Sequence, residues 1–212
     1  MSKVTIVDHG LGNLLSVTRA VAHVEGEPVL TEDLREIAGA DRLLLPGVGT
    51  FADGMRGLCE RGLLDAIKAF AATGRPLLGI CLGMQMLMDS GEEFGQHEGL
   101  GLLAGTVVAV PPTGTDGTPH RIPHIGWKEI AAPNGGAPDG PLFAGLGERP
   151  AMYFVHSFMA ITTASEATLA TCDYHGRTIT AAVGKDNLHG CQFHPEKSGP
   201  AGLHLLKNFL TL

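Results

Sequence analysis

The sequence predicts an α/β fold with an open, mostly parallel sheet that is flanked by helices and extended by antiparallel strands. In the first half, short apolar runs alternate with segments of helical periodicity, and the runs lack the polar alternation of a strand with one face in water. In the second half, strand-like runs follow one another at short spacing, which is typical of antiparallel pairing. Length and composition indicate one domain over residues 1–212.

The first half predicts four strands, each followed by a helix. The strands are expected at residues 4–7, 28–30, 42–45 and 76–80. The helices are expected from about 14 to 25 and at 34–38, 51–72 and 82–88. Strands that alternate with helices in this way form a parallel sheet with helices on both faces.

The second half predicts six more strands, at residues 105–110, 127–131, 152–156, 166–172, 178–183 and 189–193. Segments 111–119 and 133–141 are rich in proline and glycine and are expected to be surface loops. Leu203, Leu206, Phe209 and Leu210 give the last segment the single apolar face of a helix.

Composition excludes several classes of function. The net charge of −7 argues against nucleic acid as a partner, because phosphate binding needs a cationic surface. The four cysteines show neither C-x-x-C pairs nor zinc-ligand spacing, so we expect no metal. The first residues enter a strand without an apolar signal segment, and apolar runs are too short to span a membrane. We therefore expect a cytoplasmic protein with reduced thiols.

The strongest functional signal is a cysteine between an expected strand and an expected helix. Gly79-Ile-Cys81-Leu-Gly83 matches the nucleophile-elbow pattern, with cysteine in place of serine. Such a turn pushes the Cys81 sulfur off the end of the sheet, and the helix start favours the thiolate. The Leu82 N–H then faces the position of an oxyanion. Without other signals, a small buried apolar residue is an equally good interpretation of Cys81.

Phe193-His194-Pro195-Glu196 supplies a base and an acid for this nucleophile. Pro195 favours an extended conformation at His194, and residues two apart in an extended segment lie on the same face. The Glu196 carboxylate can therefore orient the His194 imidazole, which can exchange a proton with the nucleophile. A metal site at His194 and Glu196 is a weaker alternative, because a third ligand with suitable spacing is not evident.

Leu45-Pro46-Gly47-Val48-Gly49 ends another expected parallel strand. Loops at the carboxyl ends of the strands line the ligand crevice of open α/β sheets. Gly47 and Gly49 let the peptide at Val48 adopt unusual dihedral angles, so the Val48 N–H is a second candidate oxyanion donor. The segment matches neither a phosphate-binding loop nor a dinucleotide-binding fingerprint.

Together these segments resemble the class I (triad) glutamine amidotransferases, and within them the glutaminase subunits of imidazole glycerol phosphate synthase. The resemblance spans essentially the whole chain and is carried by residues 8–14, 46–51, 79–85, 123–127, 153–157 and 192–198. The Pro-Gly-Val-Gly and His-x-Gly-Trp strings distinguish this subfamily from other class I glutaminases. His9 stands in place of the family's usual tyrosine, Lys128 in place of its usual asparagine, and the loop at 110–119 is longer than typical.

The resemblance implies a flavodoxin-like glutamine amidotransferase domain that works without a cofactor. It implies that Cys81 attacks the side-chain amide of glutamine, that His194 moves the proton, and that Glu196 orients His194. The products would be glutamate and ammonia. The implied partner in a heterodimer is a (β/α)₈-barrel cyclase subunit, which uses the ammonia to make imidazole glycerol phosphate and aminoimidazole-carboxamide ribotide in histidine biosynthesis.

The resemblance also implies roles for residues outside the triad. The residues implied to form the oxyanion and glutamine site are Gly47, Val48, Gly49, Leu82, Gln85, His156 and Ser157. Gln85 lies one helical turn after Cys81, on the same face. Trp127 and Lys197 are implied to face the partner, although a lone tryptophan would otherwise be interpreted as a buried core residue.

Three other interpretations remain open from the sequence. They are a free-standing glutaminase or the glutaminase subunit of another amidotransferase, a catalytically silent partner-binding module, and a cysteine peptidase on a similar scaffold. The intact Cys81, His194 and Glu196 argue against a silent module, and a peptidase does not need the loop at 46–49. We expect any synthase to be a separate polypeptide, since 212 residues leave no room for one.

Overall fold

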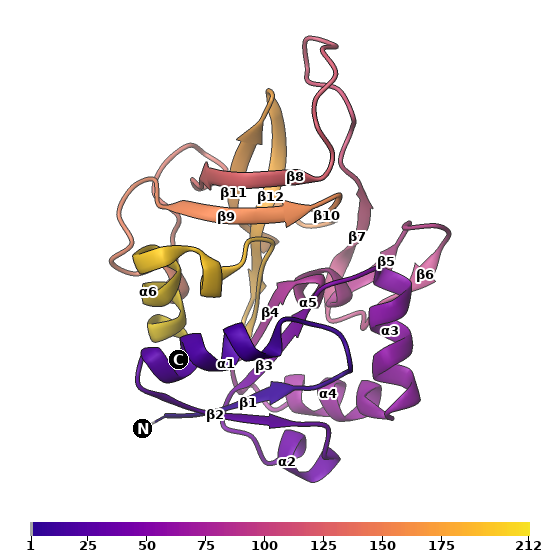
Figure 1. Cartoon of the computed structure of the whole chain (residues 1–212), viewed down its shortest axis with the longest axis vertical. Helices are drawn as coiled ribbons and strands as arrows, with labels where there is room; N and C mark the ends of the chain where they lie inside the picture. Colours follow the sequence, from indigo (N-terminus) through magenta and orange to yellow (C-terminus); the bar gives the residue numbers. More distant parts are fainter. Residues whose placement is uncertain (1) are drawn as a thin grey trace.

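The computed structural model describes residues 2–212, and the predicted class of fold is confirmed. Within these residues, seven strands form the main sheet (Figure 1). In order across the sheet they are β11 (Thr168–Tyr174), β12 (Arg177–Lys185), β13 (Leu188–Cys191), β4 (Leu77–Cys81), β3 (Leu43–Gly47), β1 (Ser2–Val7) and β2 (Gly26–Thr31). The strands from β13 to β2 run parallel, whereas β12 and β11 are antiparallel additions at one edge. The order of the parallel strands is that of flavodoxin-like sheets.

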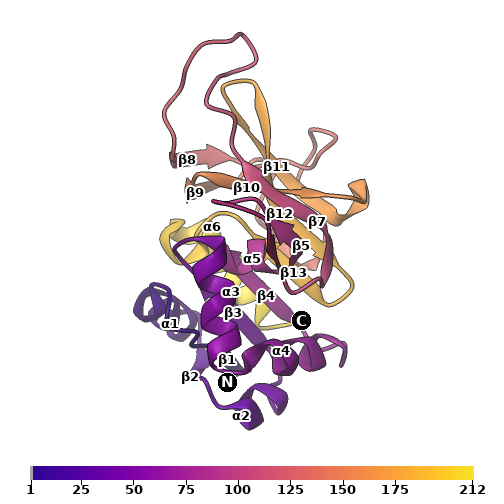
Figure 2. The same ribbon diagram turned by 90° about the vertical axis from the view of Figure 1, so that its right-hand side faces the viewer.

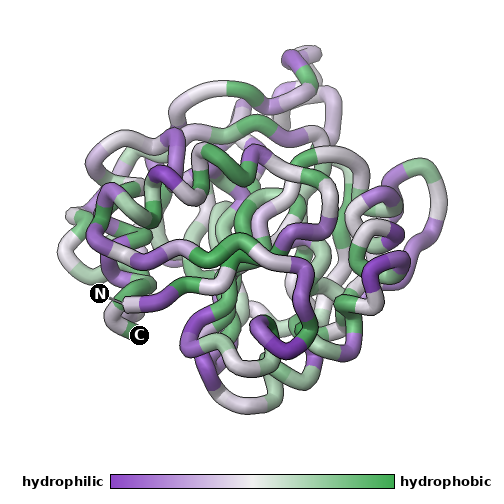
Figure 3. Tube along the Cα trace, turned by 60° about the horizontal axis from the view of Figure 1, so that its bottom comes forward, coloured by the Kyte–Doolittle hydropathy of each residue, from purple (hydrophilic) through white to green (hydrophobic). Residues whose placement is uncertain are grey.

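Helices cover both faces of this sheet. One face is covered by α1 (Leu14–His23) and α6 (Gly199–Phe209), the other by α2 (Leu34–Ala38), α3 (Phe51–Glu60) and α4 (Leu63–Ala71) (Figures 1 and 2). Alternate residues of a strand point to opposite faces. Leu44 accordingly packs in the core under α1 and α6, and its neighbour Leu45 packs in the core under α3 and α4. The hydropathy of the chain follows this arrangement, with apolar segments in the interior and polar segments in outer loops (Figure 3).

Two smaller sheets extend the main one within the described residues. The first contains, in spatial order, β10 (Phe158–Thr162), β7 (Leu103–Ala109), β5 (Met88–Gly91) and β6 (His97–Glu98). The second is an antiparallel ribbon of β8 (His124–Glu129) and β9 (Ala151–His156). The ribbon reaches the carboxyl end of β4, since the Val155 carbonyl oxygen lies 4.0 Å from the Cys81 sulfur.

Some elements differ from the sequence prediction. The helix expected at 51–72 is two helices, because the chain turns at Gly62, whose φ is +68°. The helix expected at 82–88 is α5 (Leu82–Met86), and the following residues enter β5. The short strands β5 and β6 were not predicted because they are largely polar. Strand β10 was not predicted because it follows β9 after one residue and lacks a turn signal of its own.

The predicted loops at 111–119 and 133–141 lie outside the three sheets, apart from an isolated bridge between Thr113 and Pro119. The first projects beyond the sheets beside the turn between β11 and β12 (Figures 1 and 2). Arg177 Nε donates to the Thr113 carbonyl oxygen at 2.9 Å, and the Thr115 N–H donates to the His175 carbonyl oxygen. These contacts fix the long loop to the antiparallel edge of the main sheet. Within residues 2–212, no helix is long and apolar enough to cross a membrane.

Candidate active site

Cys81 lies on a strained turn where β4 ends and α5 begins. Its φ of +54° is in a region that residues other than glycine rarely adopt. A Cβ on Gly79 would come within 2.7 Å of the Gly83 backbone, and a Cβ on Gly83 would overlap the Leu45 carbonyl oxygen. Only glycine fits at these two positions, so the sequence Gly-x-Cys-x-Gly permits the tight turn that presents the sulfur.

His194 and Glu196 meet beside this turn. His194 has extended backbone angles after β13, and Glu196 follows in a single 3₁₀ turn, Pro195–Lys197. His194 Nδ1 donates to Glu196 Oε1 at 2.8 Å, and both side chains are almost fully buried. The bond fixes the orientation of the ring and places its other nitrogen, Nε2, on the side away from the carboxylate. Within the described residues, Nε2 has no hydrogen-bond partner of ordinary geometry.

The surroundings of His194 favour its protonated form. Burial by itself lowers the pKa of His194, but the Cys81 sulfur and the Glu196 carboxylate outweigh burial and raise that pKa to about 10. At neutral pH the ring is therefore an imidazolium, which can give a proton to a leaving group.

The glycine-rich loop lies next to the nucleophile. Gly47 pairs with Cys81 in the β3–β4 register, and a Cβ on Gly47 would come within 3.1 Å of the Leu82 side chain. Gly49 has a φ of +125°, which a larger residue would adopt only with strain. The Val48 and Leu82 peptides therefore flank the region in front of the sulfur, as an oxyanion site requires.

A pocket of about 270 Å³ opens in front of Cys81. It is lined by Val48, Gly49, Cys81, Leu82, Gln85, Glu93, Pro123, Val155, His156, Ser157 and Phe158. The pocket thus collects most of the residues that the sequence assigned to the glutamine and oxyanion site. Gly47, His194 and Glu196 are not part of this lining: Gly47 pairs with Cys81 in the β3–β4 register, and Glu196 is bonded to His194 beside Cys81.

His156 lines this pocket with both ring nitrogens already engaged. Its Nδ1 donates to the Phe158 carbonyl oxygen at 2.8 Å, and its Nε2 lies 2.9 Å from His124 Nδ1. Burial lowers the pKa of His156 to about 4 and that of His124 to about 3, so both rings are neutral. His124 is therefore the donor in the bond between them. Because neither ring nitrogen is free, His156 forms part of the pocket wall, and polar contacts with a bound ligand must come from other residues of the lining.

Two polar residues of the site, Glu93 and Gln192, were not singled out from the sequence. Glu93, in the turn between β5 and β6, lines the pocket and accepts the Phe51 N–H at 2.7 Å. Gln192 is fully buried and contacts both Gln85 and Cys81. Glu93 belongs to no recognisable motif, whereas Gln192 lies two residues before His194 and could have been considered with it.

Trp127 and Lys197 lie on the surface next to the site. Trp127 is 54% exposed on β8 and packs against Tyr153 of β9, so it is not the buried core residue that a lone tryptophan suggests. Ile125 on the same strand is also half-exposed. Lys197 is exposed, and a Cβ on Gly199, two residues later, would come within 3.8 Å of the Trp127 ring.

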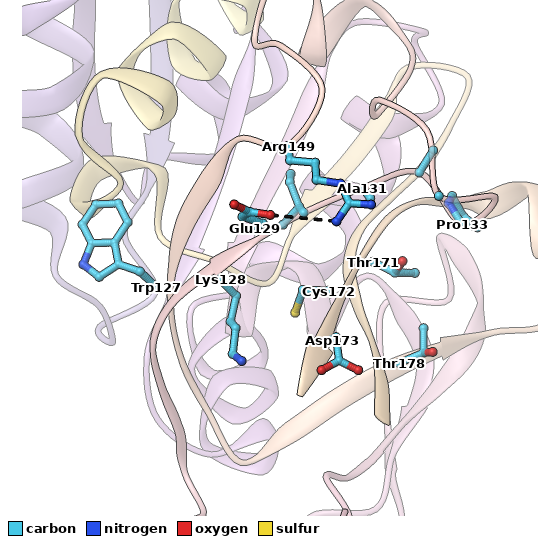
Figure 4. Close-up of a pocket in the computed structure, with 13 residues that line it drawn as sticks. Trp127, Lys128, Glu129, Ala131, Pro133, Arg149, Thr171, Cys172, Asp173 and Thr178 are labelled. Carbon is cyan, nitrogen blue, oxygen red and sulfur yellow. Dashed lines mark ion pairs between the residues drawn. The ribbon is translucent and has the colours of Figure 1, made fainter. Parts of the chain in front are cut away.

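A wider pocket of about 510 Å³ lies between β8 and β11, and Trp127 is part of its lining (Figure 4). Burial raises the pKa of the Cys172 thiol in its wall to about 12, so this cysteine is not a nucleophile at neutral pH. The Glu129–Arg149 ion pair in the same wall is exposed and is 4.0 Å long. Within residues 2–212, no cluster of side chains is suited to hold a metal ion. The smaller pocket at Cys81 is therefore the candidate active site.

Comparison with known proteins identifies the family to which the chain belongs. The family model for class-I glutamine amidotransferases matches residues 5–212. The imidazole glycerol phosphate synthase subunit HisH 1 of Legionella pneumophila (strain Lens) is 49% identical over 100% of both chains, and subunit HisH of Methanosarcina barkeri is 45% identical over 100% of both. The structure of PurLQS from Thermotoga maritima covers 99% of this chain and 97% of its own at a TM-score of 0.74 and 18% identity, which supports the fold. The chain belongs to the class-I glutamine amidotransferases.

Proposed function

We propose that this chain is the glutaminase subunit of an imidazole glycerol phosphate synthase. It hydrolyses glutamine to glutamate and ammonia and passes the ammonia to a cyclase subunit in histidine biosynthesis. The observation that carries the proposal is that Cys81, Val48 and Gly49 line one pocket, and that the His194–Glu196 pair lies beside Cys81. The full-length similarity to HisH subunits supports the choice of this synthase over another amidotransferase.

The residues of the site account for each step of amide hydrolysis. The Cys81 thiolate adds to the side-chain carbonyl of glutamine, and the Val48 and Leu82 N–H groups stabilise the oxyanion. The C–N bond breaks as the His194 imidazolium donates its proton, and ammonia leaves. A γ-glutamyl thioester remains on Cys81, and water activated by the neutral His194 hydrolyses it to glutamate. Glu196 stabilises the imidazolium in both halves of the cycle.

The far wall of the pocket is suited to the amino-acid end of glutamine. Gln85 Nε2 donates to the Phe158 carbonyl oxygen and to Gln192 Oε1, which leaves Gln85 Oε1 as an acceptor. The Glu93 carboxylate supplies a second acceptor with negative charge. Two acceptors match the α-ammonium group of a free amino acid. The part of the pocket lined by Ser157 remains available for the carboxylate of that amino acid.

The partner is proposed to be a (β/α)₈-barrel cyclase. It binds this chain, which forms a single domain, in the cytoplasm. Trp127, Ile125 and Tyr153 form an apolar surface on the outer face of the β8–β9 ribbon, and the inner end of β9 touches Cys81. Apolar surface beside an active site is typical of a binding interface. Ammonia released there would pass directly to the partner.

The proposal predicts that glutamine hydrolysis depends on the partner. We expect the chain with its cyclase and the cyclase substrate to release glutamate about tenfold faster, or more, than the isolated chain. The physical reason is that the Gly47–Val48 peptide can hold two orientations, and the loaded partner selects the one that points an N–H at the oxyanion. Glutamate release is measured for the chain alone, with the cyclase, and with the loaded cyclase.

An isolated chain that hydrolyses glutamine as fast as the loaded complex would contradict this regulation. Stimulation by the synthase of another amidotransferase, with none by the cyclase, would assign the chain to that enzyme instead. Absence of hydrolysis in all three samples would favour a silent binding module.

Trp127→Ala is expected to weaken the complex while leaving the fold intact. A large exposed aromatic side chain near the centre of an interface commonly contributes about 2–4 kcal/mol, so partner affinity should drop about 30-fold or more. Because Trp127 is half-exposed, the thermal midpoint of the isolated chain should change little. Leu34→Ala is the matched control, since Leu34 is exposed on α2, far from β8 (Figure 1). A variant that loses several kcal/mol of stability but binds normally would show that Trp127 is a core residue.

A further inference from the structure

Gln192 is a buried amide whose two ends are both occupied at the active site. It follows β13, and its backbone N–H donates to the Ala181 carbonyl oxygen at 2.9 Å. Its Oε1 lies 2.9 Å from Gln85 Nε2, and its Nε2 lies 3.6 Å from the Cys81 sulfur. A fully buried polar side chain is costly unless it is hydrogen-bonded, so these two contacts explain how Gln192 is accommodated.

The neighbours of Gln192 determine which end of its amide faces the sulfur. The Phe158 carbonyl oxygen can only accept, and it lies 3.0 Å from the Gln85 amide, so Gln85 must present its NH₂ group there. The second hydrogen of that NH₂ points to Gln192, which must therefore present its oxygen to Gln85. The NH₂ group of Gln192 is then directed at Cys81. A flipped Gln192 would set two NH₂ groups against each other.

An N–H directed at the sulfur favours the thiolate over the thiol, because a hydrogen bond to the charged form stabilises that form. The Val155 carbonyl oxygen, 4.0 Å from the sulfur, can only accept from the thiol. Gln192 and the His194 imidazolium therefore act in the same sense on Cys81. Gln85, which lines the glutamine pocket, keeps Gln192 in its productive orientation.

We propose that Gln192 is a further catalytic residue, which stabilises the Cys81 thiolate by donating its side-chain N–H to the sulfur. The proposal rests on the proposed function in one respect, that Cys81 is the nucleophile. It adds a contact that couples the glutamine-binding wall, through Gln85, to the reacting atom. It requires no group beyond those already in the site.

The test measures how the rate of Cys81 alkylation by iodoacetamide depends on pH. Glutamine is omitted, and mass spectrometry monitors the alkylation of each cysteine. Gln192→Glu keeps an acceptor for Gln85 but replaces the N–H donor with a negative charge. We expect the midpoint of Cys81 alkylation to rise by about one pH unit or more and kcat to fall about 10-fold to 100-fold. Gln192→Met, which has neither donor nor charge, should move the midpoint in the same direction by less. The exposed Cys59 reports the reactivity of the reagent in every sample.

Gln96→Glu is the matched control, because it makes the same change on an exposed turn and should leave the Cys81 midpoint unchanged. Folded Gln192→Glu and Gln192→Met variants with an unchanged midpoint would overturn the proposal, even if their thermal midpoints fell. Cys81→Ala tests the assignment of the nucleophile separately from the role of Gln192. If that variant still hydrolyses glutamine, the nucleophile assignment fails, whereas loss of hydrolysis with an unchanged midpoint in the Gln192 variants rejects the role of Gln192 alone.

Discussion

Replacing Cys81 with alanine is expected to abolish glutamine hydrolysis, with a loss of about 10⁴-fold or more in the complex. The reason is that the remaining groups can bind glutamine and polarise its amide but cannot form the thioester. Binding to the cyclase should persist, because Cys81 lies at the base of the pocket and alanine keeps the Cβ that the elbow already accommodates. The partner should also still react with ammonium salt, since only its source of ammonia is lost. Glutamate release, partner affinity and ammonium-dependent synthesis are the three measurements.

Cys59→Ala provides the control for loss of a thiol, because Cys59 is exposed at the end of α3, away from the pocket. This variant should retain the full rate. A Cys81→Ala complex that releases glutamate at the normal rate would show that the triad has been assigned wrongly. Failure with both glutamine and ammonium salt would instead indicate an inactive cyclase, and a loss of partner affinity would indicate a damaged interface.

The parallel half of the fold was predictable because its signals are local. Strands β3 and β4 are continuous apolar runs, and each ends in a glycine-containing turn that also stops the strand. The break at Gly62 was missed because helical periodicity continues on both sides of it, so only the positive φ separates α3 from α4. Strand β5 was missed for a different reason. Its Met-Asp-Ser-Gly sequence has little strand character and forms a strand by pairing with β6 and β7.

The same distinction between local and long-range signals applies to the site. Cys81 and the His194–Glu196 pair are contained within short segments whose backbone geometry the sequence itself restricts. Glu93 reaches the pocket only because β5 and β6 turn back over the start of α3, where its carboxylate meets the Phe51 N–H. Gln192 is oriented by its hydrogen bond with Gln85, which is 107 residues away in the chain. Contacts of this kind depend on the tertiary fold, and the sequence does not show which distant residues will meet.

Replacing Glu196 with glutamine is expected to lower kcat/KM by about 10²-fold to 10⁴-fold, by analogy with the acid of other triads. The amide is nearly the same shape and can still accept from His194 Nδ1, but it no longer carries the charge that stabilises the imidazolium. The carboxylate is one of the groups that raise the pKa of His194 to about 10, so its loss must lower that pKa. The imidazolium is then lost at lower pH, and the alkaline limb of the pH–rate profile should move to lower pH. Steady-state rates across pH measure both effects.

The control is Glu60→Gln, which removes one charge from the exposed end of α3 and should change neither the rate nor the pH profile. The direction of the pH shift separates the electrostatic role of Glu196 from a purely structural one. A displaced His194 ring would lower the rate at every pH but would leave the alkaline limb where it is. A change of less than about threefold, with an unmoved alkaline limb, would make Glu196 a structural residue and reduce the catalytic machinery to Cys81 and His194.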